Sequence, residues 1–121
     1  MNHHTQQVKV KSGEQIWVLN LNDCPASRGL MAFLPLSLRL TDLFGVQKYA
    51  RLPEALTESG ICMQKAEIGQ VAYWAPGPGI VIFYRQYQLM PDSGFYLLGK
   101  IDSGANMLNI GQHNELRMEI S

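Results

Sequence analysis

The sequence predicts an all-β protein: a closed antiparallel barrel of about eight strands with two short capping helices. Short runs of β-forming residues recur along the chain between turn signals. Two of these runs are apolar on both faces, so both faces must be covered. The length of 121 residues, of which 46% are hydrophobic, suits one domain with a full core. We therefore expect residues 1–121 to form a single domain in which residues 1–7 are a flexible tail.

The first predicted element is a pair of strands. Residues 8–11 alternate apolar and polar side chains, the pattern of a half-buried strand. Residues 12–14 (Ser-Gly-Glu) supply a turn, and residues 15–21 are rich in β-formers. These features predict two consecutive strands.

A short helix is expected next. Asn22 and Asp23 can cap its N-terminus, and Pro25 is tolerated in its first turn. Apolar residues within 26–34 recur at helical spacing, and Pro35 ends the pattern because its ring removes a donor. A helix this short is not stable alone in water, so it must pack on an apolar surface.

The middle of the chain predicts two strands followed by an irregular connection. Residues 36–41 alternate strictly, with three leucines on one face. Residues 42–45 form a turn, and residues 47–52 return as a second strand. Residues 53–56 begin with proline and predict one helical turn, whereas residues 57–66 are polar and irregular.

A β-hairpin is the strongest local prediction. Residues 70–75 and 80–85 are β-rich runs joined by Pro-Gly-Pro-Gly at 76–79. Prolines and glycines favour a turn and cannot continue a ladder. Because both strands are apolar on both faces, the hairpin favours a barrel over a one-layer sheet.

The last third predicts two more strands and the second helix. Residues 94–101 form a strand in which Gly99 marks a bulge or a close approach. Residues 102–109 predict a short helix that ends at Gly111. Residues 115–120 alternate and close the chain as a strand.

Charge and composition exclude several classes of protein. Ten Lys and Arg balance ten Asp and Glu, whereas nucleic-acid binders and polybasic membrane-surface proteins need a basic footprint. The polar residues 1–7 lack the apolar core of a signal peptide, and no apolar run reaches the length of a membrane span. We expect a cytoplasmic protein, without nucleic-acid or membrane partners. Zero net charge leaves a homodimer possible, because no self-repulsion opposes association.

Cysteine spacing predicts no metal site. Cys24 and Cys62 show neither a Cys-x-x-Cys motif nor a histidine at ligand spacing. We interpret them as two reduced and mostly buried thiols, with a disulfide as the alternative. No cofactor motif is present either, because prolines in residues 76–79 remove the N–H groups that a phosphate loop needs.

Several short stretches, in order, resemble the bacterial cyclophilin-like proteins of uncharacterised function. Those stretches are residues 22–26, 33–36, 41–45, 47–49, 52–56, 68–74, 82–84 and 98–101. The resemblance implies an eight-stranded antiparallel barrel with two capping helices. Two positions depart from it: Gln47 stands where the family commonly has glutamate, and Gln70 where it has aspartate. Any role that needs either carboxylate is in doubt here.

Three functions follow as hypotheses. The favoured one is binding of a small molecule or peptide in an aromatic-lined cleft, without established catalysis. The second is weak peptidyl-prolyl isomerisation, which needs an apolar pocket and a cationic donor aimed at the prolyl nitrogen. The third is a structural or homodimeric interaction module.

The candidate ligand-binding residues are aromatic and arginine side chains of the predicted strands: Tyr49, Arg51, Trp74, Phe83, Tyr84 and Arg85. The alternative interpretation is structural, since Trp74 and Phe83 lie mid-strand and fit a core. Arginines at strand ends are usually solvated. The motif segments of active cyclophilins are not found, so no catalytic residue is assigned.

Overall fold

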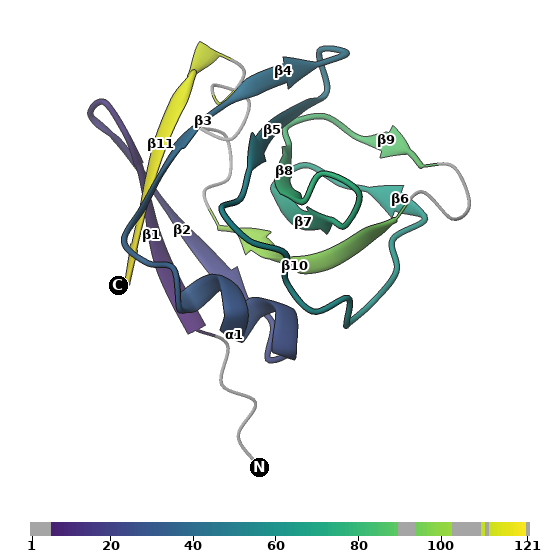
Figure 1. The fold of residues 1–121 in the computed structure, drawn as a ribbon. Coiled ribbons are helices and arrows are strands. Elements are labelled where there is room, and N and C mark those ends of the chain that lie inside the picture. Colours follow the sequence, from purple (N-terminus) through teal and green to yellow (C-terminus); the bar gives the residue numbers. More distant parts are fainter. Residues whose placement is uncertain (1–5, 90–93, 103–109, 111, 121) are drawn as a thin grey trace.

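A computed structural model of the protein describes residues 6–89, 94–102, 110 and 112–120. Nine strands form one antiparallel sheet in the order β3-β11-β1-β2-β10-β7-β8-β5-β4, and β6 pairs with β9 in a separate sheet (Figure 1). The elements are β1 (Gln6–Ser12), β2 (Gln15–Leu21), α1 (Pro25–Met31), β3 (Leu36–Arg39), β4 (Thr41–Leu43), β5 (Gln47–Arg51), β6 (Lys65–Ala66), β7 (Gln70–Trp74), β8 (Gly79–Phe83), β9 (Tyr87–Gln88), β10 (Phe95–Ile101) and β11 (Glu115–Ile120).

One bent segment nearly closes this sheet into a barrel. The edge strands β3 and β4 are separated only by Leu40, yet β3 pairs with β11 and β4 pairs with β5. Counted as one bent strand, they leave eight strands around the barrel, as predicted. The expected boundary between the strand and the turn is wrong. Asp42 and Leu43 continue the strand as β4, and the turn comprises residues 44–46.

The predicted hairpin is confirmed, and so is the first predicted pair of consecutive strands. Strands β1 and β2 pair along their whole length, starting with Gln6 opposite Leu21. The strand therefore begins two residues inside the segment expected to be a tail. Strands β7 and β8 pair around a turn that contains a cis Gly77–Pro78 peptide bond.

Helix α1 covers one end of the barrel (Figure 1). Its N-cap residue is Cys24, whose side chain makes no capping hydrogen bond to the helix backbone, so the expected cap at Asn22 or Asp23 is wrong. Instead the Ala26 N–H donates to Ser59 Oγ at 3.1 Å. A distant loop thus satisfies a donor that a local cap would normally bind.

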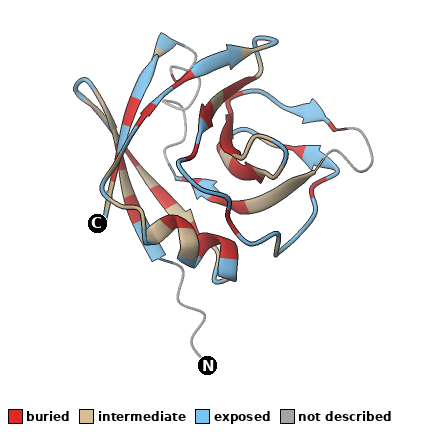
Figure 2. Cartoon of the chain, in the orientation of Figure 1, coloured by how far each residue is buried: buried red, intermediate tan, exposed pale blue. Residues whose placement is uncertain are grey.

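Alternate residues of the central hairpin enter two different cores. Along β8, Ile80 and Ile82 point into the barrel, whereas Val81 and Phe83 join a second core on the outer face. All of β8 is buried as a result (Figure 2). The second core consists of Met63, Ala66, Ala72, Val81, Phe83 and Leu89, with Tyr49, Trp74, Phe95 and Leu97 packed against it. The expectation that both faces of the hairpin are covered is confirmed.

Of the helices expected after α1, one is wrong and one lies largely outside the described residues. Residues 53–56 contain bends and no helix, because their ends are bound to the hairpin. The Leu52 N–H donates to Pro78 O at 3.0 Å, and the Leu56 N–H donates to the Tyr73 hydroxyl at 3.0 Å. The helix expected over residues 102–109 falls almost wholly outside the described residues.

Gly99 marks both a bulge and a close approach, as its position in β10 predicts. The register of β10 against β7 shifts between Leu97 and Gly99. A Cβ atom at Gly99 would collide with the carbonyl oxygen of Asn20 and lie 2.9 Å from the Leu21 Cα. Only a residue without a side chain fits at this position, where β10 pairs with β2.

Candidate functional site

An apolar pocket of about 520 Å³ opens beside the second core. Strands β5, β7, β8 and β10 each contribute residues to it, and β9 and the turn after β4 complete it. Its described lining residues are Leu43, Phe44, Gln47, Tyr49, Trp74, Val81, Tyr87, Leu89 and Phe95. Every one of them is uncharged, so the pocket is suited to an apolar, neutral occupant.

A ladder of aromatic rings forms the wall of this pocket. The Trp74 ring lies edge-on to Tyr49 with centroids 6.0 Å apart, and it stacks on Phe95 at 6.2 Å. Phe95 in turn contacts Phe83 at 5.8 Å. These geometries are the favoured ones for aromatic pairs, and they fix the rings of the wall relative to one another.

A strained turn holds an aromatic side chain at the pocket rim. Phe44 has φ 59° and Gly45 has φ 67°, and the Val46 N–H donates to Leu43 O at 3.2 Å. Tight hairpin turns with positive φ usually place Asn or Asp before the glycine, whereas phenylalanine is strained there. Yet the Phe44 ring is 81% exposed. Neither local propensity nor packing within the chain accounts for a phenylalanine at this position.

The side-chain amide of Gln47 is a buried polar group of the pocket lining. Gln47 is only 5% exposed, and its Oε1 atom accepts no hydrogen bond. Buried acceptors are nearly always satisfied. Gln47 therefore brings to the pocket lining an acceptor that lacks its hydrogen bond.

The structure brings together two of the six predicted ligand-binding residues. Tyr49 and Trp74 line the pocket. Phe83 lies on the same side of β8 but is fully buried, behind Phe95. Arg51 and Arg85 are exposed and do not belong to the described pocket lining.

Tyr84 is the sixth predicted ligand-binding residue. It directly follows β8, and the alternation along the strand directs its side chain toward the barrel. It belongs to the barrel core, and its hydroxyl donates a hydrogen bond to Asp42 Oδ1. Arg85 lies over its ring, with the guanidinium carbon 5.8 Å from the centroid. Neither residue is placed to touch a molecule in the pocket.

Asp42 anchors the turn that carries the pocket rim. Its Oδ2 accepts the Gly45 N–H at 3.0 Å, and its Oδ1 lies 3.9 Å from Nζ of the buried Lys48. Burial and the hydrogen bond to Asp42 together raise the pKa of Tyr84 to about 12. The hydroxyl therefore stays protonated, and the contact with Asp42 persists, well above neutral pH.

This raised pKa predicts a loss of stability in alkali. The folded state holds the Tyr84 proton up to about pH 12, whereas the unfolded chain releases it near pH 10. Folding thus takes up a proton in this window, and the free energy of unfolding falls as the pH rises from 10 to 12. Urea denaturation of Tyr84→Phe is expected to show a shallower fall, by about 1 kcal/mol per pH unit. Identical slopes for the two proteins would contradict the assignment.

Sequence reasoning missed all seven of the other described lining residues. Gln47 could have been found, because the period of two in a strand puts it on the face of Tyr49. Phe44 could also have been found, since a large apolar residue before glycine in a turn is unusual. Tyr87 and Leu89 follow the hairpin, and no local pattern relates them to it.

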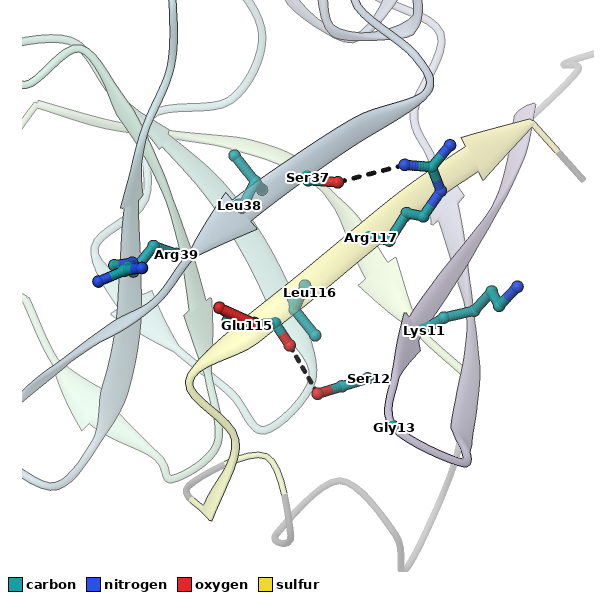
Figure 3. Close-up of a pocket in the computed structure, with 9 residues that line it drawn as sticks. All are labelled: Lys11, Ser12, Gly13, Ser37, Leu38, Arg39, Glu115, Leu116 and Arg117. Carbon is teal, nitrogen blue, oxygen red and sulfur yellow. Dashed lines mark hydrogen bonds between the residues drawn. The ribbon is translucent and has the colours of Figure 1, made fainter.

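A second hollow, of about 460 Å³, lies across β1, β3 and β11 and differs in character (Figure 3). Its lining includes Lys11, Arg39, Glu115 and Arg117. Arg117 binds Glu119 at 2.7 Å and Ser37 at 3.2 Å. Exposed pairs of this kind are typical of a solvated surface, so we take the apolar pocket as the candidate site.

The cysteines form no part of either hollow. Both are free; Cys24 is half-buried and Cys62 is exposed, so the expectation of two mostly buried thiols is wrong for Cys62. Its position opposite Tyr96 in a single β-bridge leaves it at the surface. Across the described ranges, no three His, Cys, Asp or Glu residues are grouped so that they could hold a metal ion. The described part of the chain also contains no helix with the length and apolar character needed to cross a membrane.

Comparison with known proteins gives a family and a fold. The sequence profile of the cyclophilin-like family matches residues 10–121. The solution structure of a hypothetical protein from Archaeoglobus fulgidus is similar, with a TM-score of 0.67 and 16% sequence identity over 99% of this chain and 98% of that one. No curated protein matches the chain significantly.

Proposed function

This chain belongs to the cyclophilin-like family, and we propose that it binds a small apolar molecule or a peptide side chain in the pocket walled by Tyr49, Trp74 and Phe95. The observation that carries the proposal is the cavity itself, which is lined by apolar and aromatic groups. Such cavities with a few polar groups are the usual form of a ligand site.

The strained rim supports the same proposal. A phenylalanine at positive φ costs stability and exposes an apolar ring to water. Strain of this kind gathers at ligand clamps. A ligand that covers the Phe44 ring would offset the cost of its exposure, because the apolar surface of the ring would then leave water.

Isomerisation of prolyl bonds has less support. It needs a cationic donor beside the pocket, and none of the described lining residues is charged. We therefore propose binding without isomerisation. An assay on proline tetrapeptides separates the two: the rate in buffer alone agrees with the proposal, and an accelerated rate favours the isomerase.

The binding proposal predicts uptake of the neutral fluorophore N-phenyl-1-naphthylamine, whose emission rises in apolar sites. Truncation of the wall by Trp74→Ala is expected to weaken binding roughly tenfold or more, because aromatic anchors dominate binding energies. Phe44→Gly is also expected to weaken binding while the protein stays at least as stable, since glycine accepts positive φ. Fluorescence titration and urea denaturation measure the two effects.

Ile16→Ala is the matched control for these variants. Ile16 is 58% exposed and lies on β2, outside the pocket. Its truncation should leave the affinity for the fluorophore unchanged. Absence of any emission rise with the wild-type protein, or equal losses in all three variants, would refute the proposed site.

A further inference from the structure

We infer that the ligand of the apolar pocket is an uncharged molecule that donates an N–H or O–H hydrogen bond to Gln47 Oε1. This inference rests on the proposed function, since it assigns the chemistry of the molecule bound at that site. It follows from the position of Gln47, from its unpaired oxygen and from the charges around it.

The position of Gln47 is rigid. It lies in β5 between β4 and β8, opposite Leu43 on one side and Phe83 on the other. Its neighbour Lys48 points to the opposite face of the strand, as the alternation requires. Its backbone is therefore fixed beside the pocket, and a rotation of the side chain alone is enough to turn the amide oxygen toward a bound molecule.

The unpaired oxygen selects for a donor. A buried carbonyl oxygen without a partner carries a penalty comparable to a lost hydrogen bond. The described lining residues leave Gln47 Oε1 without a donor. A ligand with a suitably placed N–H or O–H removes this penalty, whereas a purely apolar ligand leaves the oxygen unpaired.

The surroundings select against a charged ligand. An ion entering the pocket would lose its hydration to uncharged lining residues. The charged residues next to Gln47 in the β4–β5 pair, Lys48 and Asp42, lie 3.9 Å from each other and are paired, so neither is a free counter-ion. A glutamate at position 47 would supply a negative charge, but this chain has the neutral amide.

A matched pair of two-ring probes isolates the donor. Indole and benzofuran have nearly the same size and shape, but only indole carries an N–H. Titrations of the ¹⁵N-labelled protein, followed at the Gln47 side-chain amide and the Trp74 indole N–H, should show indole binding roughly 5- to 10-fold tighter, the value of one net hydrogen bond. In Gln47→Met, a side chain of similar shape without the acceptor, the two probes should bind alike.

Two further measurements keep the test independent of that variant. With the wild-type protein, 1-methylindole should lose the advantage of indole. Tryptamine, which adds an ammonium group, should bind weaker than 3-methylindole. Equal affinities of indole and benzofuran for the wild-type protein, a preference for indole that survives in Gln47→Met, or tighter binding of tryptamine would overturn the inference while the pocket stands. If neither indole nor benzofuran shifts the Trp74 signal, the proposed function itself fails.

Discussion

Phe83→Ala is expected to lower the free energy of unfolding by about 3–5 kcal/mol, the range for removal of a buried phenylalanine. The ring is fully buried at the centre of the second core and supports Phe95 from behind. Its removal leaves a cavity that the paired strands around β8 cannot collapse to fill. Urea denaturation followed by circular dichroism measures the loss.

The matched control is Phe44→Ala. The same side chain is removed from a position that is 81% exposed, so stability should change by less than about 0.5 kcal/mol. If the two variants were equally stable, the second core would contribute little to folding. The two variants also distinguish structural support of the pocket from contact with a ligand, because Phe83 stabilises the pocket wall and Phe44 forms its rim.

Gly99→Ala is expected to cost about 3 kcal/mol or more, at the upper end of the range for overpacking. The added methyl group would collide with the backbone of Asn20 and Leu21, and no side chain can rotate away to relieve the contact. The junction of β10 with β2 must then separate.

Gly13→Ala is the control for Gly99→Ala, because both variants replace a glycine with alanine. Gly13 has φ 58°, but a Cβ there meets nothing within 4 Å, so only the backbone strain remains, about 1 kcal/mol. Thermal unfolding of the two variants distinguishes collision from strain. A smaller loss of stability in Gly99→Ala than in Gly13→Ala would mean that β10 and β2 separate easily at Gly99.

Much of the fold could be predicted because local patterns suffice for strands. The alternation in residues 8–11 and 115–120, and the Pro-Gly-Pro-Gly turn, depend only on neighbours in the chain. The prediction of two covered faces was also correct, since an apolar residue on each side of a strand demands it. Local patterns failed at residues 53–56, where the Tyr73 hydroxyl and Pro78 O bind the backbone.

The candidate site was less accessible to sequence reasoning, because it is assembled from non-local contacts. Tyr49 and Trp74 were selected as aromatic residues of predicted strands, and they line the pocket. Tyr84 was selected on the same grounds, but one position of strand alternation places it on the other face. The contribution of Tyr87 and Leu89 to the pocket depends on where β9 lies in the fold, which no spacing along the chain reveals.

The alternation of β5, β7 and β8 between two cores has a consequence for how such a protein can diverge. Residues such as Ala50 and Ile82 face the barrel, whereas Gln47 and Val81 face the pocket. Each strand therefore carries two alternating sets of residues. One set maintains the barrel, and the other contains the residues that line the pocket and would change for a new ligand. Recognition can change at the positions that line the pocket, such as Gln47, while the residues that face the barrel stay the same.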